Sequence, residues 1–348
     1  MRVHVPGRVN LIGEHIDYHN LAVLPMAIQR RICIDFTTIR DAVVRGYSEE
    51  YGRVEVALQG DLKPDAPGAW SNYIKAAVQA VRARWKLTQG IEAKVTSDLP
   101  PAAGLSSSSA LLTGFTIALL QANGIEPTVE ELMEVLPDGE QFVGTRGGGM
   151  DHAAVLASEA NCSLLVGFAP LSLRSVPIPD TWGFIVAHSM KTAEKSGGAK
   201  EQFNSRRVAG QSGFEKIHAG SKLSDEEERA VRHVQSEGQR VTEAVCALQR
   251  NDKVAFGALL CESHRSLRDD LRVSCTELDE LVDVAMKNNA LGARLTGAGF
   301  GGCAIVFCEK DDRERMAQAL VHGFYVKRSG FVKERHLIFA EPSAGALR

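Results

Sequence analysis

A stretch without a single charged residue, from Leu99 to Ile125, constrains the fold of this chain more than any other feature. Prolines, a glycine and four consecutive serines interrupt its first part, and the apolar remainder, Ala110 to Leu120, is far shorter than the ~20 residues that a bilayer core requires. Alternating apolar residues predict a strand at 91–96, and residues 110–123 are typical of a buried helix. We therefore expect a Gly/Ser loop between a strand and a helix, an arrangement in which phosphate sites are often built.

The length of 348 residues suggests two domains. Residues 177–180, with two prolines and an aspartate, give the first boundary signal, so we place an N-terminal domain at 1–178 and a C-terminal domain at 179–348. The predicted strands are 31–36, 54–58, 91–96, 162–168, 302–308 and 336–340, and the predicted helices are 70–85, 110–123, one beginning near 128, and 224–248.

The charge balance restricts the partners of the chain. With 40 Lys+Arg against 43 Asp+Glu and a formal charge of −3, it has no bulk positive field to attract nucleic acid or an anionic membrane. Seven scattered cysteines without a CxxC pair fit a reducing compartment, and the first residues lack the apolar segment of a signal peptide. We expect a cytoplasmic protein that binds a small ligand, with no nucleic-acid or membrane partner.

Gly104-Leu105-Ser106-Ser107-Ser108-Ser109-Ala110 is the first of four segments that can carry chemistry. Backbone N–H groups at a helix N-terminus, with the helix dipole behind them, form an anion site suited to phosphate. A Ser-rich helix cap is the alternative, although four serines exceed what capping needs. The common nucleotide motifs, GxxxxGK[ST] and GxGxxG between strand and helix, are absent.

A second glycine-rich segment, Gly297 to Gly302, precedes the strand predicted at 302–308. Alone it is ambiguous, because a tight turn or a β-bulge uses glycine in the same way. Together with the Ser-rich loop it suggests two backbone walls around one ligand.

Arg, Glu, His and Asp side chains are crowded into Gly7 to His19, where they can converge on a polyhydroxylated or phosphorylated ligand. A zinc site on His15 and His19 is disfavoured, because HExxH needs a glutamate directly after the first histidine and Ile16 stands there. An ordinary polar loop remains the alternative.

The fourth segment is Gly147-Gly148-Gly149-Met150-Asp151-His152. An aspartate after glycines most often forms a turn or caps a helix. The same glycines let a substrate approach a carboxylate closely, so a catalytic Asp151 stays open.

In their order along the chain, these segments resemble the galactokinase branch of the GHMP small-molecule kinases. The matching segments are Gly7 to His15 with Asp17-Tyr18 (sugar signature), 100–110 (nucleotide motif), Met150-Asp151 (catalytic aspartate of Gly-x-Met-Asp-Gln), Gly292 to Gly302 (third motif), Trp70 to Tyr73 and 263–279. The likeness runs from the first residues to beyond Phe307.

The resemblance implies an α+β, two-domain GHMP kinase fold with an N-terminal ribosomal-S5-like nucleotide domain and a C-terminal ferredoxin-like α/β domain. It implies ATP and Mg²⁺ in a cleft between the domains and phosphoryl transfer to a sugar hydroxyl, which in galactokinases is the anomeric one. Carried over, Asp151 accepts or orients the proton of the attacking hydroxyl, while Arg8 offsets developing charge and helps keep Asp151 ionised.

The remaining site residues also come from the resemblance. The implied nucleotide-binding residues are Gly104, Leu105, Ser106, Ser107, Ser108 and Trp70. The implied sugar-binding residues are Glu14, His15, Asp17, Gly148, Asp151 and Phe203. Ser108 is the implied Mg²⁺ ligand.

The chain departs from the family at the second metal ligand. The glutamate expected twelve residues before the catalytic aspartate is Gly139, flanked by Asp138 and Glu140. Either a neighbouring carboxylate, for which we take Glu140, substitutes for it, or Mg²⁺ is held more weakly.

Other departures concern the sugar and the nucleotide. Where the family has the tyrosine of Tyr-Asn-x-Arg-Arg, this chain has Phe203, and where the family has a glutamine after the catalytic aspartate, it has His152. The family's Asn-Gly-Gly after the signature tyrosine is replaced by His-Asn-Leu at 19–21, and a glycine of the nucleotide loop is replaced by Ala102. Loss of one hydroxyl contact loosens or redirects sugar choice if Phe203 faces the sugar. The alternative is that Phe203 only packs a helix.

The leading hypothesis is an ATP-dependent sugar 1-kinase with galactose as first candidate. A kinase for another or larger saccharide is the runner-up, and a weakly catalytic sugar- and ATP-binding sensor is a third hypothesis, motivated by Gly139. We expect a monomer or a weak dimer.

Overall fold

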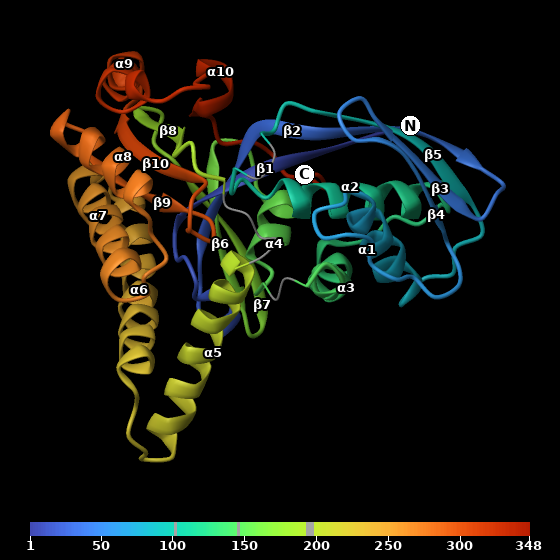
Figure 1. Ribbon diagram of the computed structural model, residues 1–348, viewed down its shortest axis with the longest axis horizontal. Helices are drawn as coiled ribbons and strands as arrows, with labels where there is room; N and C mark the ends of the chain where they lie inside the picture. Colours follow the sequence, from blue (N-terminus) through green and yellow to red (C-terminus); the bar gives the residue numbers. More distant parts are fainter. Residues whose placement is uncertain (101–102, 145–146, 193–197) are drawn as a thin grey trace.

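The computed structural model describes residues 1–100, 103–144, 147–192 and 198–348, and Figure 1 shows its two larger β-sheets, a two-stranded sheet and the helices that accompany them. Ala102, and Gly197 in the segment before Phe203, lie outside the described residues. No helix in the described parts of the chain is both long enough and apolar enough to cross a membrane.

The first sheet has five strands in the order β1-β2-β5-β3-β4. Their bounds are β1 (Arg2–Ile12), β2 (Leu24–Ile39), β3 (Val43–Ser48), β4 (Gly52–Ala57) and β5 (Gly90–Ser97). Neighbouring strands are antiparallel, except for the parallel pair β3 and β5. The strands predicted at 31–36 and 91–96 are confirmed as parts of β2 and β5, and the strand predicted at 54–58 is confirmed as β4, which ends one residue earlier, at Ala57. The crowded N-terminal segment is strand as far as Ile12, so it is not simply a polar loop.

Four helices accompany this sheet: α1 (Ser71–Arg82), α2 (Ser107–Ala122), α3 (Val129–Phe142) and α4 (Met150–Ala157). The uncharged α2 is almost wholly buried and packs against β1, β2 and β5, with α1 and α3 on the same side of the sheet (Figure 1). α3 begins with a capping box, in which Thr128 and Glu131 bond each other's backbone N–H. The predicted helices at 70–85, at 110–123 and from about 128 are therefore confirmed.

A two-stranded sheet of β6 (Cys162–Phe168) and β7 (Leu171–Pro177) leads to the second sheet, whose order is β11-β8-β10-β9. Its strands are β8 (Trp182–His188), β9 (Gly292–Thr296), β10 (Cys303–Glu309) and β11 (Leu337–Ala340), all antiparallel to their neighbours. The helices here are α5 (Gly198–His218), α6 (Asp225–Gln249), α7 (Lys253–Asp269), α8 (Thr276–Lys287), α9 (Arg313–Gly323) and α10 (Lys333–His336). The predicted strands at 162–168, 302–308 and 336–340 and the helix at 224–248 match β6, β10, β11 and α6.

The two sheets are tied together by the end of the chain. Ser343 N donates to the Ala27 carbonyl at 2.9 Å, and Gly345 N donates to the Ser158 carbonyl at 2.8 Å, so the last residues return to the first half. The change of sheet falls between Pro177 and Trp182. Domain limits at 178/179 stay a prediction.

Candidate active site

Arg8 connects the predicted catalytic aspartate to the Ser-rich loop. Its Nε donates to Asp151 Oδ1 at 2.7 Å, its Nη2 lies 2.5 Å from the same oxygen, and its Nη1 donates to the Gly104 carbonyl at 2.7 Å. The side chains of Arg8 and Asp151 are only 5% and 16% exposed. One guanidinium in a largely dry environment therefore fixes the carboxylate relative to the start of α2.

An irregularity in β1 brings Arg8 to this point. The β1–β2 register shifts between Pro6 and Arg8, and Arg8 N donates to the Leu105 carbonyl at 3.1 Å. A Cβ at Gly7 would lie 2.4 Å from the Leu99 side chain and 2.9 Å from the Leu105 carbonyl oxygen. Glycine is therefore required for the loop to approach the strand.

Ser106, at the N-cap of α2, does not act as an ordinary cap. Its φ of 60° is left-handed, its side chain makes no capping hydrogen bond, and its buried hydroxyl has no partner among the described residues. A capping serine adopts extended backbone and bonds the first turn. Strain combined with an unsatisfied hydroxyl is typical of a ligand site, which favours the anion interpretation of the loop that includes the half-buried Ser107 and Ser108.

The second glycine-rich segment lies directly against this loop. A Cβ on Gly297, whose φ is +84°, would be 2.9 Å from the Gly104 carbonyl oxygen. The segment forms the turn between β9 and β10. The two backbone segments that we expect to surround one ligand are therefore in contact at Gly104 and Gly297.

Glu140 reaches the same place from α3. Ser109 Oγ donates to Glu140 Oε1 at 2.5 Å and lies 3.5 Å from Asp151 Oδ2, and Glu140 is 8% exposed. Gly139 faces away and packs against α1 and α2, while Asp138 lies on the exposed surface. Of the three neighbouring positions, only Glu140 is brought to the start of α2.

Asp17 and Gly148 meet beside Asp151. Asp17 begins a short 3₁₀ turn, η1 (Asp17–His19), and its Oδ2 accepts a hydrogen bond from Gly148 N at 3.0 Å. A Cβ at Gly148 would lie 2.5 Å from the backbone of Asp17 and of Tyr18, so only glycine fits. Burial and the nearby Asp151 carboxylate raise the pKa of Asp17 to about 6.

His15 is held by two protein groups. Its Nε2 lies 3.0 Å from the Ala298 carbonyl oxygen and its Nδ1 lies 2.8 Å from Tyr18 Oη. Because a carbonyl only accepts, Nε2 carries the proton and Nδ1 accepts from the phenol. Burial lowers the pKa of His15 to about 3, which keeps the ring neutral. The Phe203 ring packs on this pair, with centroids 5.1 Å from His15 and 6.0 Å from Tyr18.

Glu14 is also engaged by the protein. Its Oε2 accepts from Asn10 Nδ2 at 2.8 Å, and its Oε1 accepts from Gly297 N at 2.5 Å and lies 3.6 Å from Arg294 Nη2. Burial raises the pKa of Glu14, opposed by Arg294 and Arg8. These bonds tie the sugar signature to the second glycine-rich segment, and direct contact of Glu14 with a sugar stays a prediction.

The other departures from the family pattern have packing roles in the structure. The His19 ring packs against Phe214, and a Cβ at Gly210 would lie 2.6 Å from its Nε2. His152 is fully buried, with Nε2 3.6 Å from Glu140 Oε1. Trp70, which matches the family pattern and is an implied nucleotide-binding residue, packs beside Tyr51 and Gly46, and its described contacts do not bring it to the Ser-rich loop.

Two residues of this region are not singled out by sequence interpretation. Ser109 lies within the Ser-rich segment Gly104 to Ala110. Its hydroxyl links the carboxylates of Glu140 and Asp151 only because α3 packs against the start of α2. Glu237 lies on the charged helix α6, yet it is fully buried, accepting from Gly13 N at 2.9 Å and from Ser263 Oγ at 2.7 Å. Nearby His233, Arg294 and Arg240 lower its pKa to about 2. The residues around Glu237 in the sequence are typical of an exposed helix face, so the sequence does not indicate that Glu237 is buried.

Family models cover most of these elements. The galactokinase galactose-binding signature matches residues 1–36, the GHMP kinases N-terminal domain matches 72–159, and the GHMP kinases C-terminal domain matches 244–327.

Curated relatives match nearly the whole chain. It is 33% identical to a galactokinase of Streptomyces coelicolor over 366 residues, which covers 99% of this chain and 92% of the relative. It is 34% identical to a galactokinase of Bos taurus over 346 residues, which covers 93% and 88%.

Solved structures agree with these matches. The galactokinase of Lactococcus lactis, complexed with galactose, superposes with a TM-score of 0.90 at 26% identity, covering 99% of this chain and 94% of that one. The mevalonate kinase of Methanococcus jannaschii, with a TM-score of 0.69 at 18% identity over 92% and 95% of the two chains, shares the fold. The chain has the two-domain α+β fold of the GHMP kinases, and it belongs to the galactokinase family.

Proposed function

We propose that this chain is an ATP-dependent sugar kinase that phosphorylates the anomeric hydroxyl of galactose or a related sugar. The observation that carries this is the bridge from Asp151 through Arg8 to the Gly104 carbonyl. This bridge holds a half-buried, oriented carboxylate beside a helix N-terminus with the features of a phosphate site.

Asp151 is the proposed acceptor of the proton from the attacking sugar hydroxyl. Because Arg8 already holds its Oδ1, the carboxylate is oriented before the sugar binds. The same guanidinium is available to offset negative charge that develops as the phosphoryl group moves.

The nucleotide is proposed to bind along Gly104, Leu105, Ser106, Ser107 and Ser108. The first N–H groups of α2 have no partner within the helix, and the orphaned hydroxyl of Ser106 adds a further donor for phosphate. Trp70, which lies on the β3–β4 side, is proposed to contact the nucleotide away from its phosphates.

Mg²⁺ is the proposed cofactor, held by Ser108 and Glu140. Glu140 is nearly buried, and within the described residues no lysine or arginine pairs with it, so its charge is available to a cation. The described residues contain no cluster of three or more His, Cys, Asp or Glu suited to a metal. This fits Mg²⁺, which commonly uses one or two protein carboxylates together with substrate phosphates and water. When bound there, the ion supplies neutralisation of phosphate charge.

The sugar is proposed to lie against Asp17, Gly148 and Asp151, with His15, Glu14 and Phe203 around it. Asp17 is the strongest of these candidates, because it is half-buried and adjoins the catalytic carboxylate. The net charge of −3 supports a chain without nucleic-acid or anionic-membrane partners. A cytoplasmic monomer or weak dimer completes the proposal.

The test is Asp151→Asn, assayed by ADP release over a panel of sugars. We expect turnover to fall by ~10²–10⁴-fold, because general-base assistance is lost, while ATP affinity stays near the wild-type value. Activity within a few-fold of wild type would remove Asp151 from this role.

A kinase for a different or larger saccharide is the second candidate function. It is favoured by Phe203, which packs on His15 and Tyr18 without a hydroxyl to offer. The same panel decides between the two, because a sugar with a higher kcat/KM than galactose identifies the second function.

A further inference from the structure

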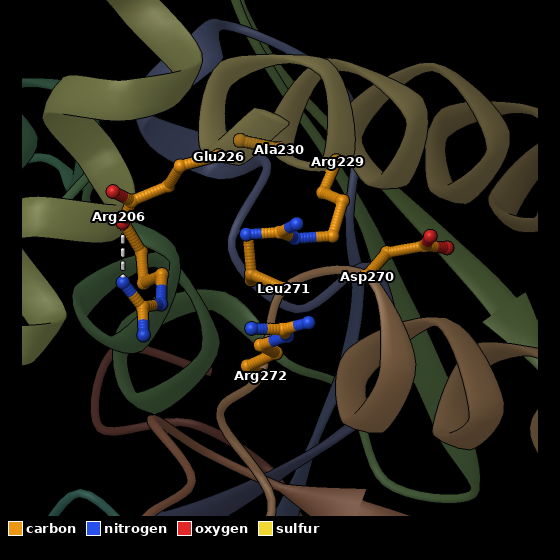
Figure 2. Close-up of a pocket in the computed structure, with 7 residues that line it drawn as sticks. All are labelled: Arg206, Glu226, Arg229, Ala230, Asp270, Leu271 and Arg272. Carbon is orange, nitrogen blue, oxygen red and sulfur yellow. Dashed lines mark hydrogen bonds and ion pairs between the residues drawn. The ribbon is translucent and has the colours of Figure 1, made fainter. Parts of the chain in front are cut away.

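A cavity of about 220 Å³ lies outside the site described above, between α5, the first turn of α6 and the end of α7 (Figure 2). Its lining residues are Arg206, Glu226, Arg229, Ala230, Asp270, Leu271 and Arg272. Three guanidinium groups thus face one small space against two carboxylates.

Both carboxylates are used at the margins of the cavity. Glu226 Oε1 accepts from Arg206 Nη1 at 2.6 Å, and Asp270 Oδ1 accepts from Arg232, outside the cavity, at 3.1 Å. Figure 2 shows the Glu226 carboxylate beside Arg206 and the Asp270 carboxylate turned away from the other side chains. Neither acid therefore neutralises the middle of the cavity.

Arg229 and Arg272 extend into that middle from opposite sides (Figure 2), and neither has an ion pair within the described parts of the chain. Arg229 is half-buried, and Arg272 has a left-handed φ of 58°. The Nε of Arg206 is buried without a partner among the described residues. Because like charges repel, two guanidinium groups that point into one cavity and have no ion pair within the described residues lack a counter-charge there.

We propose that this cavity is a second anion site that binds a small oxyanion of the phosphate class. Arg229 and Arg272 supply planar donors that match phosphate oxygens, and the orphaned Nε of Arg206 adds a third donor direction. The site is distinct from the Ser-rich loop, because none of its lining residues belongs to α2 or to the loop before it.

The cavity is connected to the sugar signature by two short paths. Arg206 lies one helical turn after Phe203, whose ring packs on His15. On the other side, Val273, next to Arg272, accepts a hydrogen bond from Phe300 N at 2.7 Å, close to the Ala298 carbonyl that holds His15. The oxyanion is therefore either a free anion or a substituent carried by the acceptor sugar.

The test titrates inorganic phosphate into the full chain by calorimetry, at constant ionic strength and with saturating ADP to occupy the nucleotide loop. Saturable binding is expected in wild type, weakened about tenfold in Arg229→Gln and in Arg272→Asn, since each loses one charged donor. Asparagine tolerates the left-handed backbone at position 272, so that variant keeps its fold. Arg250→Gln, at the far end of α6 and exposed, is the matched control and should bind phosphate as wild type does.

Two further experiments, a phosphate titration with galactose bound and a comparison of acceptor sugars in the kinase assay, identify the source of the oxyanion. If phosphate binds with the same Kd when galactose is also bound, the ligand is a free anion. If hexose 6-phosphate is a better acceptor than hexose, and both variants lose that advantage, the oxyanion belongs to the acceptor. Absence of saturable phosphate binding, or equal Kd values in wild type and both variants, overturns the proposal. Because the calorimetric titration needs no turnover, its result is independent of whether the chain proves to be a sugar kinase.

Discussion

Replacing Glu140 by alanine should raise the Mg²⁺ concentration needed for half-maximal rate by ~10–100-fold, equivalent to about 1.4–2.7 kcal/mol of metal affinity. The magnitude follows from its position. The carboxylate is 8% exposed, bonds Ser109 Oγ at 2.5 Å, and reaches the start of α2, where the phosphates are proposed to bind. Asp138 is the matched control, because it is two residues away on the exposed face of the same helix.

The assay measures initial rates of ADP release at fixed ATP while free Mg²⁺ is varied. Asp138→Ala should reproduce the wild-type curve, and Glu140→Ala should shift it to higher Mg²⁺ without an equal loss of rate at saturating metal. A second readout separates metal binding from damage to the fold. Without Mg²⁺, Glu140→Gln should melt no lower than wild type, because it removes a buried charge that has no lysine or arginine partner within the described residues. An unchanged Mg²⁺ dependence in Glu140→Ala would refute the assignment.

Three further predictions concern charge and specificity. Arg8→Lys keeps the charge but cannot hold both Asp151 and the Gly104 carbonyl, so kcat should fall by ~10–150-fold, one lost bond to a charged group being worth about 1.5–3 kcal/mol; steady-state kinetics check this, and wild-type kcat would contradict it. The pKa of Asp17 is about 6 in the folded protein and about 4 in the unfolded chain, so between these pH values the folded protein binds more protons than the unfolded chain does. The contribution of Asp17 to the free energy of unfolding therefore falls as pH rises from about 4 to 6. Its carboxylate also loses acceptor capacity below pH 6, so the KM for sugar should rise there in wild type and stay flat in Asp17→Asn, and parallel KM profiles would exclude the role. Phe203→Tyr should improve kcat/KM for galactose over other sugars by about 0.5–1.5 kcal/mol, the value of one ordinary hydrogen bond, and an unchanged sugar profile would show that Phe203 only packs α5.

The sequence by itself determined the elements whose signals are local. The capping box at Thr128, the uncharged helix α2 and the alternation in β5 each depend on residues a few positions apart. Capping geometry and side-chain periodicity act over that same range, which is why these elements are predictable. The order of the motifs was enough to indicate the family, and with it Asp151 and Arg8.

Tertiary structure alone decided which side chains meet. Arg8 and Asp151 are 143 positions apart, and only packing of β1 against α4 brings them together. Glu140 rather than Gly139 faces the site, because neighbouring positions on a helix point about 100° apart and a motif alignment cannot resolve one position. Glu237 and the cavity around Arg229 and Arg272 have no sequence signal, since their burial and charge environment arise only when helices distant in sequence pack together.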